Sequence, residues 1–317
     1  MRGAVFHEGE LAWQRREGSY TALAEAGPRV IRDHLPQQHR DFFAQLPFLV
    51  LGALDAGGQP WASVLCGAPG FAHSPDPREL VVGARPLQGD PLAPSLQVGA
   101  ALGLLGIEPH TRRRNRLNGH LTRIGQEGLV VRVDQSFGNC PKYIQARKPE
   151  FIAARHGAAR PARWLRGLDA AAWALVARAD TFYIATAHPA AAAGGEERAW
   201  GVDVSHRGGK PGFVRVEGAS RLTVPDFAGN RFFQTFGNLA LDPRCGLLFL
   251  DFPTGDLLYL AARAEVIAAG PELAEFQGAE RLLQVEVIAA VWLDGAMLLR
   301  WGEPQLSPHL AATGHWA

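Results

Sequence analysis

The stretch "AWGVDVSHRGGKPGF" (residues 199–213) decides the fold, because a shorter version of it, "PWASVLCGAPGF" (60–71), occurs earlier in the same chain. Each has a tryptophan in second place, then an apolar stretch, and ends in Pro-Gly-Phe. Five more pairs of similar segments follow one order in both halves of the chain. These pairs are "FLVLGALDA" (48–56) with "FYIATAHPA" (182–190), "ELVVGARPLQGD" (79–90) with "RLTVPDFAGN" (221–230), "GLLGIEP" (103–109) with "GLLFLDFP" (246–253), "LNGHLTRI" (117–124) with "LAARAEVI" (260–267), and "GLVVRVDQ" (128–135) with "RLLQVEVIAAVWL" (281–293). A repeat this long indicates duplicated domains rather than a solenoid.

Each half is predicted to contain about six short strands. The segments are rich in Val, Leu, Ile and Phe and are bounded by Gly, Pro and Asp. Short connections such as "DAGGQP" (55–60) and "FPTGD" (252–256) favour antiparallel pairing. Small antiparallel sheets commonly close into barrels, which removes exposed edges. The sequence therefore predicts a mainly β protein with a six-stranded barrel in each half.

The remaining segments give the domain boundaries. Residues 1–40 read as an arm with little core character that ends at the start of a helix over 37–46. The first barrel is placed at 41–150 and a helical linker at 151–179, where Asp169 is a suitable N-cap for a helix over 170–179. The second barrel is placed at 180–303 and a tail at 304–317.

Composition restricts the class of protein. The 317 residues are 47% hydrophobic and 20% charged, and their formal net charge is +1, which favours neither nucleic acid nor an anionic membrane as partner. The three cysteines are far apart and odd in number, which suits a reducing compartment. The first 18 residues lack the apolar core of a signal peptide and no apolar run is long enough to span a membrane, so we expect a soluble cytoplasmic protein. The 11 histidines do not cluster at metal-ligand spacing, and no metal site is expected.

Two glycine-rich stretches of the second half suggest a site for an anion. Asn230 and Arg231 follow Gly229 and open a predicted helix over 230–240, where a guanidinium and free backbone amides can bind a phosphate. An ordinary capped helix, with Asn230 as the N-cap, is the alternative. The turn after the strand at 202–205 carries a hydroxyl and cations that can bind a flat polar ring, although a loop without a ligand also explains it.

The order of motifs in the second half resembles the pyridoxamine 5'-phosphate oxidase-like family of FMN-binding split barrels. The motifs are "VDVSHRGGKPGFVRV", "TVPDFAGNRFFQTFGNLALDPRCGLLFL" and "DLLYLAARAEV". The first half has weaker counterparts, "GAPGF", "QGDPLAPSL", "RRRNRLNGH" and "SFGNCPKYIQAR", so the resemblance covers about 41–150 and 180–295. It implies two tandem split barrels packed as an intrachain pseudo-dimer, FMN as cofactor, and an oxidoreductase that acts on a small molecule.

The resemblance and the residue chemistry together give a set of candidate site residues. The flavin ring is expected against Val204, Ser205, His206, Arg207, Gly208 and Gly209, and the phosphate at Asn230 and Arg231. Asn139 and Lys142 are candidates to reach the flavin from the first half, and Cys140 is a candidate for a catalytic thiol. In the first half, Asp90 and Pro91 stand where the second has Asn230 and Arg231, and they would repel a phosphate and remove an amide donor. We therefore expect one FMN per chain.

Other functions stay open at this point. The same fold suits a flavin-binding or sensing module without turnover, or another cofactor such as deazaflavin or haem. The run "TRRRNR" (111–116) reads as a solvated strand or an interdomain contact, with an anionic ligand as a further alternative. A homodimer is also compatible with the sequence.

Overall fold

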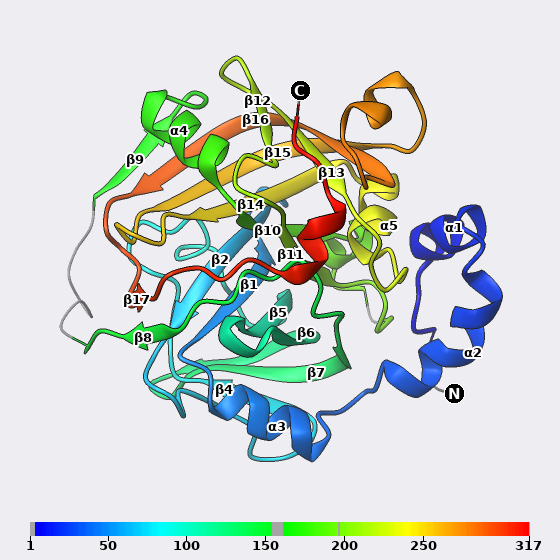
Figure 1. Cartoon of the computed structure of the whole chain (residues 1–317). Helices are drawn as coiled ribbons and strands as arrows, with labels where there is room; N and C mark the ends of the chain where they lie inside the picture. The colour runs from blue at the N-terminus through cyan, green and yellow to red at the C-terminus, as the bar shows by residue number, and fades with distance from the viewer. Residues whose placement is uncertain (1–3, 154–160, 196, 317) are drawn as a thin grey trace.

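The computed structural model describes residues 4–153, 161–195 and 197–316, and the described part of the chain is mainly β, with three sheets and five α-helices (Figure 1). The fold class expected from the sequence is confirmed at this level. One large sheet comes from each half of the chain, and a small two-stranded sheet joins segments from both halves.

The first half contains seven strands that form one sheet. They are β1 (Phe48–Leu54), β2 (Pro60–Cys66), β3 (Ala72–His73), β4 (Glu79–Val82), β5 (Ala101–Glu108), β6 (Arg113–Gly125) and β7 (Gly128–Gly138). Their order in the sheet is β2-β1-β5-β6-β7-β4-β3, and all the pairs are antiparallel.

The second half repeats this arrangement. Its strands are β10 (Thr181–Ala187), β11 (Val202–Gly208), β12 (Arg215–Glu217), β13 (Arg221–Asp226), β14 (Arg244–Leu250), β15 (Leu257–Ile267) and β16 (Arg281–Leu293). Their order, β11-β10-β14-β15-β16-β13-β12, is that of the first sheet with each strand replaced by its counterpart in the duplicated sequence. The paired segments of the sequence therefore occupy corresponding strands.

The prediction of six-stranded closed barrels is wrong in detail. Both sheets are open paths, with β2 and β3 at the two edges of the first and β11 and β12 at the two edges of the second. Each half contributes seven strands rather than six, and β9 (Ala162–Leu165) adds an eighth strand to the second sheet by pairing with β16. The seventh strand of each half, β3 or β12, is only two or three residues long, which is why its pattern escaped the sequence analysis.

The described residues of the segment between the halves, 151–153 and 161–179, are less helical than expected, and residues 154–160 of the predicted linker lie outside the described part of the chain. Helix α4 (Ala170–Arg178) begins as predicted at Asp169, whose carboxylate accepts a hydrogen bond from the amide of Ala172. Strand β9 lies in the same segment, and β8 (Pro149–Phe151) pairs with β17 (Leu299–Trp301) to form the small sheet. The C-terminal end of the second half is thus tied to the end of the first, and the linker strand β9 is tied to the second sheet.

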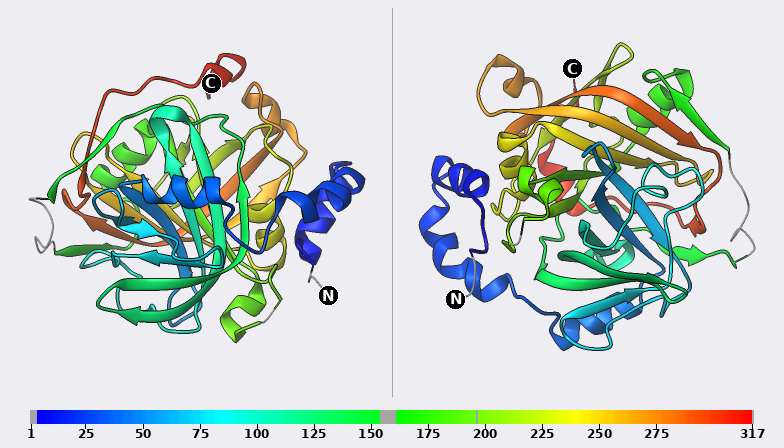
Figure 2. Two further views of the ribbon diagram at one scale, coloured as in Figure 1. Left: turned by 90° about the horizontal axis from the view of Figure 1, so that it is seen from below. Right: turned by 180° about the vertical axis from the view of Figure 1, so that it is seen from behind.

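The N-terminal arm is helical and buries more apolar surface than the sequence suggested. Helices α1 (Glu8–Arg16) and α2 (Tyr20–Val30) lie at one side of the molecule (Figures 1 and 2), and α3 (Gln37–Ala44) follows where a helix was predicted. Phe6 and Trp13 are buried, and their rings contact Phe232 and Phe236 of the second half respectively. The arm therefore belongs to the packed structure.

The two sheets meet through β1, β2 and β5 of the first and β10, β11 and β14 of the second. The larger of the hydrophobic cores runs through this junction, with Leu51 and Leu104 in the same cluster as Ala185, Val204 and Leu248. Glycines let the strands approach closely. A Cβ atom on Gly103 would lie 2.7 Å from the carbonyl oxygen of Val202, and one on Gly246 would overlap the backbone of Pro60 and Trp61.

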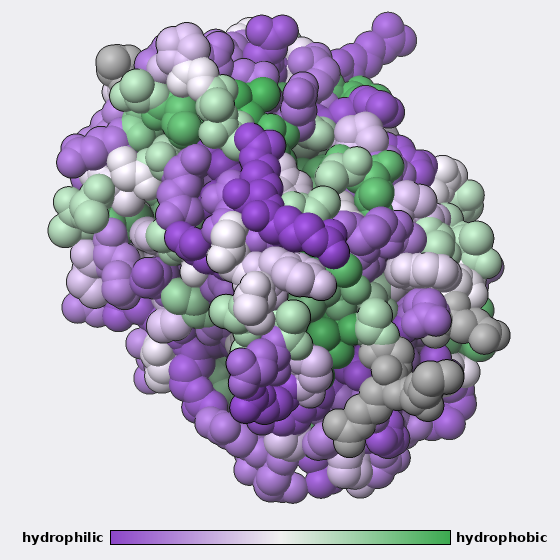
Figure 3. Space-filling view, turned by 90° about the vertical axis from the view of Figure 1, so that its right-hand side faces the viewer, coloured by the Kyte–Doolittle hydropathy of each residue, from purple (hydrophilic) through white to green (hydrophobic). Residues whose placement is uncertain are grey.

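The face seen in Figure 3, on the side of the molecule that carries the N-terminal helices, is mostly hydrophilic, and its hydrophobic residues form small scattered patches. No helix in the described part of the chain is long and apolar enough to cross a membrane.

Replacing Gly246 by alanine should destabilise the protein, because the added methyl group has to push the two sheets apart or displace backbone. Overpacking of this kind costs about 1–3 kcal/mol of the free energy of unfolding. Gly201→Ala is the matched control, since a Cβ atom there meets nothing within 4 Å, and it should change stability by less than about 0.5 kcal/mol. Urea denaturation measures both. Equal stabilities of the two variants would contradict the close packing of the sheets.

Candidate functional site

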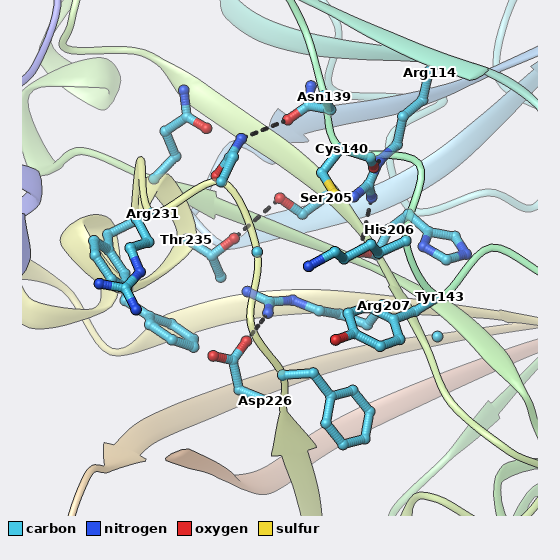
Figure 4. Close-up of a pocket in the computed structure, with 18 of the residues that line it drawn as sticks. Arg114, Asn139, Cys140, Tyr143, Ser205, His206, Arg207, Asp226, Arg231 and Thr235 are labelled. Carbon is cyan, nitrogen blue, oxygen red and sulfur yellow. Dashed lines mark hydrogen bonds and ion pairs between the residues drawn. The ribbon is translucent and has the colours of Figure 1, made fainter. Parts of the chain in front are cut away.

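A pocket opens where the two halves meet, and both halves line it (Figure 4). It encloses about 880 Å³, part of which is open solvent. The first half contributes residues of β6 and of the segment after β7, and the second contributes β11, the end of β13, the loop after it and the first turn of α5 (Gln234–Leu241). The lining residues are Arg114, Arg116, Asn139, Cys140, Lys142, Tyr143, Ser205, His206, Arg207, Gly208, Phe213, Pro225, Asp226, Phe227, Gly229, Asn230, Arg231, Phe233, Gln234, Thr235, Phe236 and Arg281.

Nine of the eleven residues proposed from the sequence lie in this lining, namely Asn139, Cys140, Lys142, Ser205, His206, Arg207, Gly208, Asn230 and Arg231. Val204 does not, because its side chain packs against Gly52 in the junction between the sheets. Gly209 is also outside the lining, and its carbonyl accepts a hydrogen bond from Gln145. The structure thus brings together residues from two distant parts of the sequence. Of the six residues proposed to contact the ring, it leaves Ser205, His206, Arg207 and Gly208 in the pocket.

The arginines of β6 were read from the sequence as a solvated strand or an interdomain contact, with an anionic ligand as a further alternative, and Arg114 and Arg116 contact the other half. Arg116 forms a buried ion pair with Asp203 and donates hydrogen bonds to Ser205 Oγ at 2.6 Å and Gln234 Oε1 at 2.8 Å. Arg114 donates to the carbonyls of Cys140 at 2.7 Å and His206 at 3.4 Å. Since side chains two residues apart share one face of a strand, both arginines cross to the other half.

Residues 205–208 continue strand β11 rather than form the expected turn, which comes at Gly209–Gly212 instead. The Ser205 hydroxyl accepts hydrogen bonds from Arg116 and from Thr235 Oγ1 at 3.1 Å, so it is already engaged. Burial, together with the charges of Arg114 and Arg207, holds the pKa of His206 well below its usual range, so the ring is neutral at pH 7. The Arg207 guanidinium pairs with Asp226 and lies over the ring of Phe236.

The loop at 227–233 differs from the prediction of a helix that starts at Asn230. Helix α5 begins four residues later, and Phe233 at its N-cap has a left-handed φ of 62°. Asn230 Oδ1 accepts a hydrogen bond from the amide of Phe232, which bends the loop. Its side-chain amide reaches Asn139 of the first half at 3.2 Å. The first turn of α5 still lines the pocket, so a helix N-terminus does face the site, although Arg231 lies on the rim before it.

Charge is unevenly distributed around the pocket. Six of the lining residues are cations (Arg114, Arg116, Lys142, Arg207, Arg231 and Arg281), and one, Asp226, is an anion. Asp226 pairs with both Arg207 and Arg281, and Asp203 outside the lining pairs with Arg116. Arg114, Lys142 and Arg231 have no carboxylate partner among the described residues. Burial and the neighbouring arginines lower the pKa of Arg114 to about 10, which leaves it charged at pH 7.

Several hydrogen-bond donors at the pocket also lack a partner. Within the described residues, no partner is found for five buried nitrogen atoms of the lining, namely the N–H donors Arg116 Nε, Asn139 Nδ2, Arg207 Nε and Gln234 Nε2, and the ring nitrogen His206 Nε2. Buried donors without a partner cost free energy, and proteins seldom leave them in this state. A ligand rich in acceptors, or ordered water, would satisfy them.

Aromatic rings form the apolar part of the walls. Tyr143, Phe213, Phe227, Phe233 and Phe236 all line the pocket. Three of the four non-glycine residues with positive φ in the described chain, Tyr143, Arg231 and Phe233, are also in this lining. Such conformations cost about 1–3 kcal/mol each and gather at functional sites.

The sequence analysis missed several residues of the site. Asp226, Gln234, Thr235 and Arg281 come from segments read only as strand or helix. A signal did exist for Arg114 and Arg116, because their spacing of two marks one face of a strand. The aromatic residues at 227, 233 and 236 gave no such signal, since aromatic residues are common in any core.

The corresponding position of the first half is filled by its own side chains. Strand register shows that Ser63 corresponds to Ser205. In the first sheet Ser63 pairs with Leu51, and the next residue of β1 pairs with Gly103. In the second sheet Ser205 pairs with Ile184, and the next residue of β10 pairs with Gly246. Ser63 donates a hydrogen bond to the buried carboxyl of Asp90, and the amide of Leu92 donates to the same carboxyl at 2.8 Å. Asp90 was expected to repel a phosphate from the corresponding loop, and the structure instead turns its carboxyl inward, onto Ser63 and the amide of Leu92.

One other cluster of side chains has the composition of a metal site. His7, Glu8 and His188 lie with their ligand atoms within 4.8 Å of one another. The Nδ1 atoms of both histidines accept hydrogen bonds from backbone amides, at 3.2 Å for His7 and 3.1 Å for His188. Neutral rings in this arrangement carry their proton on Nε2, where a metal would need the lone pair. His188 Nε2 then donates to Glu8 at 3.2 Å, and hydrogen bonding explains the cluster.

No protein-family model and no curated protein matches the chain. Among solved structures, it is similar to a putative pyridoxamine 5'-phosphate oxidase from Lactobacillus delbrueckii, with 16% identity over 40% of this chain and 94% of the other, at a TM-score of 0.31. It is also similar to a HupZ variant from Group A Streptococcus, with 9% identity over 39% of this chain and 98% of the other, at a TM-score of 0.30. These scores are too low to support an argument about function.

The buried carboxyl of Asp90 gives a prediction on stability. Burial raises its pKa to about 6 from 3.8, so the native state is penalised when this group ionises. The free energy of unfolding should fall as pH rises from about 4 to 7, by up to about 3 kcal/mol for this group. Asp90→Asn has no charge to bury, so its stability relative to the native protein should rise over that range. Urea denaturation at pH 4 and pH 7 measures the difference, and parallel pH curves would contradict it.

Proposed function

We propose that the pocket between the two halves binds FMN and that the protein is an FMN-dependent oxidoreductase acting on a small molecule. The observation that carries the proposal is the surplus of positive charge and of unpartnered N–H donors in one partly aromatic pocket. Such a pocket selects a ligand that is anionic, rich in acceptors and flat. FMN has these properties, since it joins a phosphate to a ring with several carbonyl and nitrogen acceptors.

The phosphate is assigned to the rim. Arg231 is exposed there, and Lys142 lines the same pocket from the first half with no carboxylate partner among the described residues. Charged donors bind phosphate more strongly than neutral ones do, and the N-terminal end of α5 adds its dipole to the same region. A phosphate at the rim also keeps its remaining oxygen atoms in water.

The ring is assigned to the inner part of the pocket. Tyr143, Phe227 and Phe236 offer apolar faces for its flat surface. Gln234 Nε2 and Asn139 Nδ2 are buried donors that can bind acceptors on its edge. Ser205 is a weaker candidate than the sequence indicated, because Arg116 and Thr235 already occupy its hydroxyl.

The two halves are proposed to act as an intrachain pseudo-dimer with one FMN. The identical strand orders and the reciprocal contacts of β1, β2 and β5 with β10, β11 and β14 support this arrangement. Arg116 and Tyr259 also correspond by register. Arg116 pairs with Leu105, two residues after Gly103, and Tyr259 pairs with Leu248, two residues after Gly246. Arg116 lines the pocket, whereas Tyr259 is buried beside Asp90, and its burial together with the Asp90 carboxylate raises the pKa of that phenol. The first half thus has a filled position instead of a second pocket.

FMN supplies the electron-transfer chemistry when it is bound, and the chain supplies position and electrostatics. The cations of the pocket stabilise negative charge on the ligand, and the aromatic walls limit the access of water. His206 is neutral and Asp226 is paired, so neither is assigned a role as acid or base. A flavin-binding module without turnover has the same binding site, and a substrate screen with reduced nicotinamide distinguishes the two.

Arg231→Ala should weaken FMN binding by about ten-fold, which corresponds to the lower end of the roughly 1.5–3 kcal/mol of a charge-assisted hydrogen bond, as suits an exposed residue. Riboflavin, which lacks the phosphate, should bind the variant and the native protein equally. Arg221→Ala is the control, since Arg221 is exposed on β13 outside the pocket. Flavin fluorescence titration gives the dissociation constants. Equal FMN affinities of Arg231→Ala and the native protein would remove the phosphate from this rim.

The same titration should give one FMN per chain, because Ser63, Asp90 and Tyr259 fill the corresponding position of the first half. A stoichiometry near two would contradict that interpretation. The visible spectrum of the purified protein tests the cofactor itself. Flavin bands support FMN, and a Soret band would assign the pocket to haem instead.

A further inference from the structure

We propose that Cys140 is a modification site, at which small anionic disulfides enter the pocket and form a mixed disulfide with the thiol. The proposal uses the pocket described above but does not require FMN to be its ligand. It rests on the position of the thiol, on the charge around it, and on the burial of the other two cysteines.

Cys140 differs from Cys66 and Cys245 in its surroundings. It is half-buried and lines the pocket, and Figure 4 shows its sulfur atom in the same region as Asn139, Ser205 and Arg114. Cys66 and Cys245 are fully buried in the hydrophobic cores. Burial raises the pKa of Cys66 to about 12 and also raises that of Cys245, so neither forms the reactive thiolate at neutral pH.

Two cations close to Cys140, Arg114 and Lys142, have no carboxylate partner among the described residues. Arg114 Nε binds the carbonyl of Cys140 itself at 2.7 Å, and Lys142 is two residues further along the chain. A positive pocket raises the local concentration of anions and speeds their association. Gln234 Nε2 in the same lining is buried and has no acceptor among the described residues, which independently indicates that a ligand with acceptors belongs there.

The reaction is an ordinary thiol–disulfide exchange. Cys140 loses its proton to solvent, and the thiolate attacks one sulfur of the disulfide. A new S–S bond forms to Cys140 as the original S–S bond breaks, and the second half of the reagent leaves as a thiolate that takes up a proton. The group left on Cys140 then occupies the pocket, so a modified chain should be unable to bind an anionic ligand there.

The test compares two aromatic disulfides that differ in charge, the dianion 5,5'-dithiobis(2-nitrobenzoate) and neutral 4,4'-dithiodipyridine. Their rate constants are measured on the FMN-free protein and on the neutral thiol N-acetylcysteine amide. The ratio of anionic to neutral rates should be at least about ten-fold higher for the protein at low salt and should fall as salt screens the pocket. Mass mapping should place the label on Cys140.

Three variants control the test. Cys140→Ser should abolish labelling of the folded protein. Lys142→Met should lower the charge selectivity, whereas Lys148→Met, at an exposed lysine outside the pocket, should leave it unchanged. A rate ratio equal to that of the reference thiol, or labelling at another cysteine, would overturn the proposal. Charge-selective labelling of a protein that binds no FMN would contradict only the proposed function. FMN binding without charge-selective labelling would contradict only the proposal about Cys140.

Discussion

The ion pair between Arg116 and Asp203 is the interaction on which the site depends. Both side chains are buried, and they come from different halves of the chain. Breaking a buried pair by removing one partner is strongly destabilising, because the other charge is left without compensation. The same guanidinium also orients Ser205 and Gln234, so it fixes β11 and the first turn of α5 relative to β6. The pocket keeps its shape only while the two halves stay in register here.

The N-terminal arm supports the opposite wall of the pocket. Gly9 of α1 and Gly237 of α5 approach so closely that a Cβ atom on either would overlap the other helix. Glu17 accepts a hydrogen bond from Arg231 with its carbonyl and forms an ion pair with Arg281 through its carboxylate. The loop at 227–233, which contains two residues with positive φ, therefore packs against the N-terminal helices. The sequence analysis had described this segment only as an arm.

The duplicated halves have diverged at corresponding positions, and the divergence has a physical logic. An arginine on β6 reaches into the second half, where it meets an acid, a hydroxyl and an amide. A tyrosine on β15 takes the corresponding place beside a buried carboxyl in the first half. Burying a carboxylate without a cation is costly, so this group holds its proton more firmly than an exposed one. One position became cationic and open, and the other came to hold a buried carboxyl and a buried phenol and is closed.

The sequence by itself determined the duplication, the strands, the capped helix at Asp169, and most of the residues that gather at the site. These features depend on local periodicity and turn chemistry, which are written in neighbouring residues. Only the tertiary structure decided that the sheets stay open, that Arg207 is neutralised by Asp226, and that Val204 lies in the junction rather than in the pocket. It also decided the start of α5 at Gln234, because a left-handed residue at 233 interrupts the helical pattern. Such outcomes depend on which side chains of the two halves come into contact, and a local sequence pattern does not specify contacts between residues far apart in the chain.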